Sequence, residues 1–367
     1  MFLSGVRLTT ATTTSRISYS HLLNRGCSLS GSYQQFPNLS ISKSILSSSI
    51  NSQIQQQRYF SSNKNSNSSS SSFNIRPRNR PIDIEHKMNE FNSDKIYKFA
   101  GIQLLVGEDK NQNIEAARKA IEEAASNGAN IICLPECFNC PYSTSVFNEY
   151  AEKFGGPTTT MLADAAKRLK IWLIGGSIPE RGDDGKIYNC SFIFNPSGEL
   201  VGKHRKIHLF DINVPGKITF RESEILSPGE TPTIIELGDG VRLGVGICYD
   251  IRFPELAMLY AKEGCQILVY PGAFNMTTGP AHWELLQRGR AVDNQVYVAA
   301  VSPARNPKST YTAWGHSTVV SPWGDIVSTT EHDPTIIYAN IELAKVKEMR
   351  TNIPVYQQKK LTTTFKI

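Results

Sequence analysis

The chain has 367 residues, with 39 Lys and Arg against 33 Asp and Glu, so its formal net charge is +6. The positive excess is confined to residues 1–82, which contain nine basic residues and no Asp or Glu. Residues 83–367 hold 30 basic and 33 acidic residues, and this balance argues against a nucleic-acid-binding protein. The chain contains no run of apolar residues long enough to cross a membrane. Its seven cysteines, an odd and scattered set, are typical of a reducing compartment.

Residues 1–60 are predicted to be a mitochondrial transit peptide that directs the protein to the matrix. The segment is rich in Arg and Ser and lacks acids, a composition typical of organellar targeting. Arg58, followed by Phe60 and then the small Ser61, resembles a processing site, so we expect the cleaved form to start near Ser61. Residues 61–94 are interpreted as a polar linker. The alternative for this N-terminal part is a low-complexity tail without a targeting signal, because residues 68–72 are a run of serines.

Strand and helix patterns alternate in the next part of the chain. Residues 96–106 are predicted to be a strand, and residues 113–127 an amphipathic helix that Gly128 caps. The following predicted elements are a strand at 130–134, a helix at 160–170 and a strand at 171–174.

The pattern then indicates antiparallel pairing. Predicted strands at 188–194 and 199–203 flank the turn 195–198, and strands at 233–237 and 241–247 flank the turn 238–240. The later predicted elements are helix 254–263, strand 266–270, helix 282–294, strand 295–301, a hairpin around 321–324, strand 335–341 and helix 343–350. This order predicts one α/β domain over residues 95–367, with helices outside mixed sheets.

Cys248 stands at the corner between the apolar strand pattern 241–247 and a helix start at Pro254. A thiol at such a corner projects from the end of a sheet, beside backbone N–H groups that can hold an oxyanion. Cys248 is therefore a candidate nucleophile. The alternative is a small buried apolar side chain, which is common for a free cysteine.

Two further polar residues follow predicted strands. Glu136 follows the apolar stretch 131–135, and Lys206 follows a hairpin strand. Strand ends at one edge of a sheet are where α/β enzymes assemble their sites. A thiol, a carboxylate and an ammonium suit amide hydrolysis through a thioester, because the thiol needs a base and the tetrahedral intermediate needs a cation. The alternative for Glu136 is an ordinary acid in a loop, and the alternative for Lys206 is a place in a solvated run of basic residues.

Three short motifs carry a family resemblance. Leu134-Pro135-Glu136, His204-Arg205-Lys206 and Gly246-Ile247-Cys248 resemble the catalytic motifs of the nitrilase superfamily of carbon–nitrogen hydrolases. The stretches 136–142, 206–220 and 270–284 are similar to its omega-amidase branch almost residue for residue. The resemblance covers about residues 95–361. It implies a nitrilase-like α-β-β-α sandwich, pairing of subunits into a homodimer, and no metal or organic cofactor.

The resemblance also implies roles for individual residues. Cys248 corresponds to the nucleophile, Glu136 to the general base and acid, and Lys206 to the residue that stabilises the intermediate. The residues alone suggest that the backbone N–H of Tyr249, next to Cys248, assists Lys206 in this. Glu222 matches an additional glutamate that positions the substrate and the lysine. A solvated loop acid is the alternative for Glu222.

Members of the omega-amidase branch act on small-molecule amides, the omega-monoamides of short dicarboxylic acids, chiefly 2-oxoglutaramate and 2-oxosuccinamate. Such substrates carry a carboxylate, and Arg252 is the candidate that binds it, because a guanidinium can donate two parallel hydrogen bonds. Tyr142, Phe274 and Thr278 fall on segments that line the pocket in relatives. For Phe274, a place in the core is the alternative.

The sequence also allows other functions. A different amidase of the superfamily, acting on N-carbamoyl amino acids or deaminated glutathione, is the main alternative, and an inactive scaffold is another. The Cys137/Cys140 pair has the spacing of a metal or redox site, but neither a second pair nor a histidine pair follows nearby, so no metal is expected. His204, His208, His282 and His316 are interpreted as surface or core residues.

Overall fold

A computed structural model of the protein describes residues 90–359. In chain order, the first elements are β1 (Ile96–Gln103), α3 (Lys110–Ser126), β2 (Ile131–Cys133), α4 (Phe147–Tyr150), α5 (Pro157–Leu169), β3 (Trp172–Ile174), β4 (Ile178–Arg181), β5 (Ile187–Phe194), β6 (Leu200–Arg205), β7 (Asp211–Val214), β8 (Ile218–Arg221) and the 3₁₀ helix η1 (Glu222–Glu224). The remaining elements are β9 (Thr233–Gly238), β10 (Val241–Val245), the 3₁₀ helix η2 (Cys248–Arg252), α6 (Pro254–Lys262), β11 (Ile267–Pro271), α7 (Gly279–Asn294), β12 (Tyr297–Val301), β13 (Thr318–Val320), β14 (Ile326–Thr329), β15 (Thr335–Glu342), α8 (Leu343–Asn352) and α9 (Val355–Gln358).

The strands form two large mixed sheets and one small hairpin. The first sheet has the order β15-β1-β2-β3-β5-β4, with β6 beside β5, and the second has the order β14-β13-β12-β11-β10-β9. Strands β1, β2 and β3 run parallel, as do β10, β11 and β12. The hairpin consists of β7 and β8. The parallel strands form the middle of each sheet and end at the edge where the site lies.

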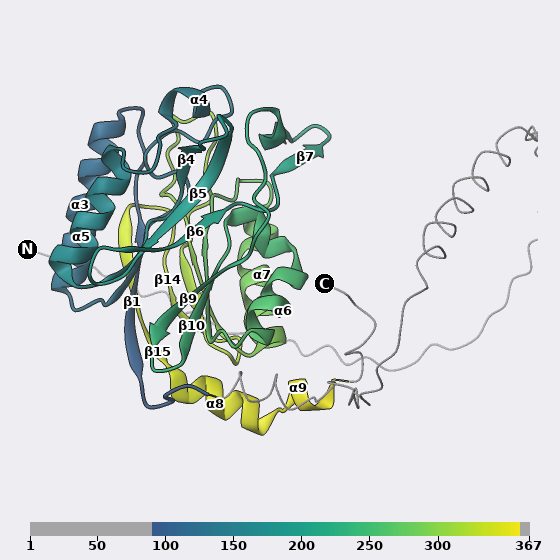
Figure 1. Ribbon diagram of the computed structural model, residues 1–367. Coiled ribbons are helices and arrows are strands. Elements are labelled where there is room, and N and C mark those ends of the chain that lie inside the picture. The colour runs from purple at the N-terminus through teal and green to yellow at the C-terminus, as the bar shows by residue number, and fades with distance from the viewer. Residues whose placement is uncertain (1–89, 360–367) are drawn as a thin grey trace, which may run out of the picture. The chain divides into compact units, whose positions relative to one another are not determined.

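The two sheets pack face to face, and helices cover their outer faces. Alternation along β1 shows this arrangement, because Phe99 packs between the sheets while Ala100 packs under α3 and α5. The outer face of the second sheet packs under α6 and α7. Figure 1 shows the two helix pairs on opposite sides of the sheets. The predicted α-β-β-α sandwich is therefore confirmed.

Several helices begin about one turn earlier than the sequence pattern indicated. Helix α3 begins at Lys110 and not at 113, because the side chain of Asp109 accepts a hydrogen bond from Gln112 N and caps it. Helix α5 begins at Pro157, where a missing N–H is tolerated, and α7 begins at Gly279. Apolar periodicity alone does not mark these first turns. Strand β1 is shorter than predicted, since it ends at Gln103 and not at 106.

Four short elements were not predicted: β4, the β7–β8 hairpin, α4 and α9. Strand β4 contains a proline and two charged residues, which suit only an edge strand, and β4 does lie at the edge of its sheet. Strands β7 and β8 have only four residues each. Elements this short carry too few residues for a period to be visible.

The predicted transit peptide, its processing position and the polar linker up to residue 89 lie outside the described residues. Within residues 90–359, every helix is too short or too polar to cross a membrane.

The packing between the sheets predicts an unequal response along β1. Phe99 is fully buried in this layer, whereas Ile96 on the same strand is 56% exposed. We expect Phe99→Ala to lower the free energy of unfolding by about 3–5 kcal/mol, because it leaves a cavity. Ile96→Ala is the matched control and is expected to change it by less than about 0.5 kcal/mol. Urea unfolding of both variants measures the difference, and equal losses would contradict this packing.

Candidate active site

Glu136 follows β2 at the edge where the parallel strands end. Pro135 stops the strand, and the next residue, Cys137, has a φ of 49°, so the backbone turns sharply. The Glu136 carboxylate is 1% exposed. Its Oε1 accepts a hydrogen bond from Asn189 Nδ2 at 2.8 Å, and its Oε2 accepts one from the backbone N–H of Ala273 at 2.8 Å.

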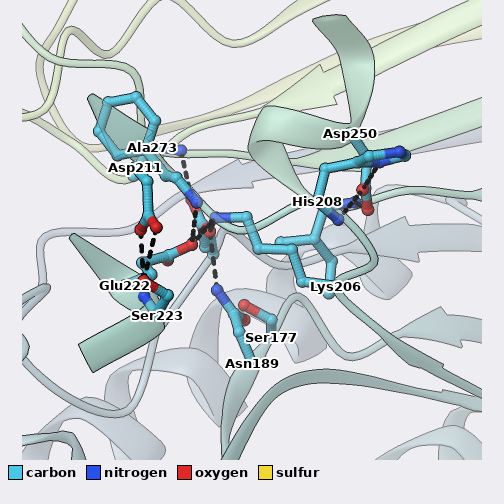
Figure 2. A network of polar contacts seen from close by, with 12 residues as sticks. Ser177, Asn189, Lys206, His208, Asp211, Glu222, Ser223, Asp250 and Ala273 are labelled. Carbon is cyan, nitrogen blue, oxygen red and sulfur yellow. Dashed lines mark hydrogen bonds and ion pairs between the residues drawn. The ribbon is translucent and has the colours of Figure 1, made fainter. Parts of the chain in front are cut away.

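Lys206 directly follows β6 and is also buried. Its backbone N–H donates to Asn189 O at 2.8 Å, which continues the pairing of β6 with β5. The Nζ atom lies 3.0 Å from Glu136 Oε1 and 2.9 Å from Glu222 Oε2. Figure 2 shows the lysine side chain reaching Glu222. A lysine with no exposed surface needs such partners.

Glu222 is the first residue of η1, directly after β8. Its side chain is fully buried, so the solvated loop acid considered from the sequence is wrong. Tyr142 donates its hydroxyl to Glu222 Oε1 at 2.6 Å, and the backbone N–H of Phe210 donates to Oε2 at 2.7 Å. Glu222 therefore ties the β7–β8 hairpin, the Tyr142 segment and Lys206 together.

Cys248 opens η2 at the end of β10, with a φ of 48°. A non-glycine residue in this region of the map is strained, and such strain concentrates at functional sites. The Cys248 thiol is near enough to the Glu136 carboxylate and to the Ala273 N–H to interact with both. The chain crosses closely here, since a Cβ on Gly272 would lie 3.2 Å from Cys248 Cα. The site thus joins Glu136 and Lys206 from the first sheet to Cys248 and Ala273 from the second.

The buried charges do not balance, because two carboxylates face one ammonium. Burial raises the pKa of Glu136, and the charge of Glu222 raises it further, while Lys206 opposes both. Burial alone would lower the pKa of Lys206, but the two carboxylates outweigh it and raise that pKa. Burial also raises the pKa of the Cys248 thiol. At neutral pH the site therefore holds a protonated thiol beside a carboxylate with increased proton affinity.

Asp250 connects the segment of Lys206 to the segment of Cys248. Its Oδ2 accepts from His204 Nε2 at 3.1 Å and from Ile247 N at 2.9 Å, and its Oδ1 accepts from His208 Nδ1 at 2.7 Å. Burial would raise the pKa of Asp250, but the hydrogen bonds from both histidines outweigh it and hold that pKa well below its usual range. His204 is fully buried and His208 is half-buried, so the two predicted surface or core histidines have a shared structural role. Figure 2 shows Asp250 beside His208.

Arg252, the last residue of η2, has no acidic partner within the described residues. Its guanidinium lies 4.6 Å from the ring centre of Phe274 and 5.5 Å from that of Tyr249. Its Nε is buried without a hydrogen-bond partner in residues 90–359, and Nη1 lies 3.3 Å from His282 Nδ1. Burial lowers the pKa of Arg252.

The other residues predicted to bind substrate lie around these groups. Tyr142 is buried against Glu222 and Lys206. Phe274 is buried and packs on Trp283 with ring centres 5.0 Å apart, so it belongs to the core and supports Arg252 at the same time. Thr278 occupies the N-cap position of α7 without a capping hydrogen bond from its side chain, and its hydroxyl donates to Asn275 Oδ1 at 3.3 Å.

A cavity of about 30 Å³ opens beside the site. Glu136, Tyr142, Ala273 and Tyr311 contribute to its lining. The Tyr311 hydroxyl donates to Ala273 O at 2.6 Å, and its ring lies 4.6 Å from that of Tyr142. Sequence reasoning missed Tyr311 and Asn189, and it assigned no role to Asp250, two residues after Cys248. Neither Tyr311 nor Asn189 has a local pattern that separates it from an ordinary polar residue.

The Cys137/Cys140 pair also borders this cavity, and both thiols are free and buried. Among residues 90–359, His, Cys, Asp and Glu side chains form no group of three or more that is placed to hold a metal ion.

Comparison with known proteins places this site in a family. The sequence profile of carbon-nitrogen hydrolases matches residues 99–351. The chain is 62% identical to nitrilase homolog 2 of Dictyostelium discoideum, over 73% of this chain and 81% of the relative. It is 57% identical to the omega-amidase NIT2 of Bos taurus, over 72% of this chain and 95% of the relative.

Solved structures agree with the sequence relatives. The crystal structure of Saccharomyces cerevisiae Nit3, described as a member of branch 10 of the nitrilase superfamily, is 46% identical with a TM-score of 0.67 and covers 72% of this chain and 97% of that one. With the family profile covering most of the described residues and the sandwich fold that the motifs implied, the chain belongs to the carbon-nitrogen hydrolase family, the nitrilase superfamily.

Proposed function

We propose that this protein is an omega-amidase, which hydrolyses omega-monoamides of short dicarboxylic acids, such as 2-oxoglutaramate and 2-oxosuccinamate, to the dicarboxylate and ammonia. The observation that carries the proposal is the position of Arg252. This half-buried cation stands four residues after Cys248, which belongs to the buried group of Cys248, Glu136 and Lys206. The guanidinium has no carboxylate partner in residues 90–359. Omega-amidases that are 55–58% identical to the chain support the same activity.

The first half of the reaction forms a thioester. Glu136 takes the proton of the Cys248 thiol, and the sulfur attacks the amide carbon. The carbonyl oxygen becomes an oxyanion, which the Lys206 ammonium and the Tyr249 backbone N–H stabilise; one such donor is typically worth about 3–4 kcal/mol in the barrier. Glu136 then gives its proton to the leaving nitrogen. The C–N bond breaks, ammonia leaves, and the acyl group remains on sulfur.

The second half returns the enzyme to its starting state. Glu136 accepts a proton from a water molecule, whose oxygen attacks the thioester carbon. The C–S bond breaks and the sulfur recovers the proton from Glu136. The raised pKa of Glu136 suits both halves, since a base and acid works best when its pKa approaches the working pH. Glu222 keeps Lys206 in place throughout.

Arg252 supplies the substrate selection in this scheme. The far carboxylate of the substrate would pair with the guanidinium, which Phe274 and Tyr249 flank with their rings. Because burial has removed water from part of the arginine, an ion pair there is stronger than at an exposed site. An amide without this carboxylate leaves the Arg252 cation unpaired and is a poorer substrate.

Two alternatives predict different results. Another amidase of the superfamily would prefer N-carbamoyl amino acids or deaminated glutathione, and an inactive scaffold would turn over none of these compounds. The intact Glu136, Lys206 and Cys248 favour an enzyme over a scaffold.

A panel of amides tests the proposed activity. We expect ammonia release from 2-oxoglutaramate and from succinamate, and none from the Cys248→Ala variant. Arg252→Gln should lower kcat/KM for these substrates by about 10–100-fold, because a charge-assisted hydrogen bond is lost, and change turnover of an uncharged amide of equal length much less. Arg288→Gln, an exposed arginine on α7, is the control. Equal losses on charged and uncharged amides would reject Arg252 as the carboxylate site.

The negative charge of Glu222 is expected to affect how kcat/KM depends on pH. Glu222→Gln removes a negative charge that raises the pKa of Glu136, so that pKa should fall. The carboxylate form of Glu136 is the active base, and activity is lost as the pH drops through its pKa. We therefore expect the acidic limb of kcat/KM to move to lower pH by on the order of one unit, although kcat falls. Glu224→Gln alters an exposed acid of the same helix and should leave the limb unmoved; a shift in the opposite direction for Glu222→Gln would contradict the charge argument.

The exposed face of α6 and α7 supports a homodimer. Met258 on α6 and Leu285 and Val292 on α7 are 36%, 67% and 42% exposed, and the turn bearing Trp323 lies beside Val292, which a Cβ on Gly324 would contact. Such a cluster of apolar side chains is typical of an interface. We expect Leu285→Glu to convert dimers to monomers in light scattering after size exclusion, with Ile96→Glu as the exposed control. A wild-type monomer would reject the proposal.

Location in the mitochondrial matrix is supported by the acid-free, Arg-rich residues 1–60. We expect the full chain to be imported and cleaved near Ser61, which N-terminal sequencing checks, and a chain lacking residues 1–60 to stay in the cytosol. If the shortened chain were still found in mitochondria, the targeting signal would lie outside residues 1–60.

A further inference from the structure

Asn189 makes hydrogen bonds to both Glu136, the proposed base, and Lys206, the buried cation. It is the third residue of β5, between β4 and β6, and it is 1% exposed. Its backbone carbonyl accepts the Lys206 N–H at 2.8 Å, and its side-chain amide donates to Glu136 Oε1, also at 2.8 Å. Figure 2 shows its amide nitrogen directed toward this network.

The two oxygens of Glu136 have different surroundings. Oε1 receives the Asn189 amide and the Lys206 ammonium, at 2.8 and 3.0 Å. Oε2 receives the backbone N–H of Ala273. The residue before Ala273 is Gly272, and a Cβ on it would lie 3.2 Å from Cys248 Cα, so Oε2 is on the side of the Cys248 segment. Both oxygens are therefore hydrogen-bonded, but Oε1 is held by two side chains, whereas Oε2 is held by one backbone N–H beside the Cys248 segment.

We propose that Asn189 is a positioning residue of the hydrolase, which anchors Glu136 Oε1 so that Oε2 alone exchanges protons with Cys248 and the substrate. The inference rests on the proposed role of Glu136 as base and acid. It goes beyond that role because it assigns a separate task to each oxygen and names the residue that separates them.

An uncharged donor is what this position requires. An amide N–H stabilises the ionised carboxylate and adds no charge to a site where two carboxylates already face one ammonium. An aspartate of the same shape would place a third negative group against Oε1, and one proton would then be shared between the two acids. The ionisable groups that act on or face Glu136 are Lys206, Glu222, Cys248, Cys137, Tyr142 and Tyr311.

The remaining polar atom of Asn189 argues against a purely structural role. Its Oδ1 is buried and has no hydrogen-bond partner within residues 90–359. A buried acceptor without a partner lowers stability, and a native structure keeps such a group where another task requires it. Here the side chain makes one polar contact in the described structure, and that contact is with Glu136.

Three variants test the inference. Asn189→Asp keeps the shape and replaces the donor by an acid, while Asn189→Ser removes the donor without adding charge. Ser191→Ala is the matched control, because Ser191 lies two residues along β5, is buried, and its hydroxyl has no partner among the described residues. Thermal unfolding of each variant identifies any that fails to fold.

Two measurements are made as a function of pH: kcat and KM for 2-oxoglutaramate, and the rate at which iodoacetamide alkylates Cys248, followed by mass spectrometry. We expect Asn189→Asp to lower kcat at neutral pH about tenfold or more with little change in KM, and to move the acidic limb upward by about one unit. Alkylation of Cys248 should slow in parallel, and activity should recover partly as the pH rises. Asn189→Ser should lower kcat with a smaller shift, and Ser191→Ala should match wild type.

The outcomes separate this inference from the proposed function. A folded Asn189→Asp or Asn189→Ser variant with the kcat, pH limb and alkylation rate of wild type overturns the inference; if Asn189→Asp does not fold, Asn189→Ser decides. An Asn189-dependent alkylation profile in a protein that does not hydrolyse 2-oxoglutaramate would support the inference and reject the substrate.

Discussion

The site depends on one buried ammonium held between two carboxylates. Lys206 has no exposed surface, and a charged lysine is tolerated there only because Glu136 and Glu222 lie at 3.0 and 2.9 Å. The three residues come from different segments, so the ion group also fixes how those segments meet. The surplus negative charge of Glu222 adds to burial in raising the pKa of Glu136.

The surrounding polar groups keep this ion group in register with the nucleophile. Asp250 bonds to His204 and His208 on the Lys206 side and to Ile247 beside Cys248. The strained backbone of Cys248 is thereby held by a fully buried carboxylate rather than by local turn preferences. Glu136 and Cys248 both stand in short turns that follow strands. The sheets fix where each turn begins, and the turn fixes where the side chain points.

Sequence alone predicts much of this arrangement because the reactive residues follow apolar strands. Glu136 and Cys248 each stand three residues after a buried strand and Lys206 directly follows β6, and the ends of neighbouring strands meet at one edge. Asn189, in the middle of β5, and Tyr311, in a loop, carry no such signal. Their importance comes from contacts with residues far away in the chain, and a single sequence does not reveal those pairs. The early starts of α3 and α5 were missed for the opposite reason, since they depend on local features, the Asp109 cap of α3 and Pro157 in the first turn of α5, rather than on apolar period.

The division of the site between the sheets has a consequence for the whole molecule. Neither half of the sandwich contains both the sulfur and its base, so the apolar layer from Phe99 to Val269 acts as the spacer that sets their separation. Warming or mild denaturant that loosens this layer by a fraction of an ångström would misalign proton transfer while the backbone remains ordered. Loss of turnover is therefore a more sensitive gauge of how tightly the halves are clamped than loss of secondary structure.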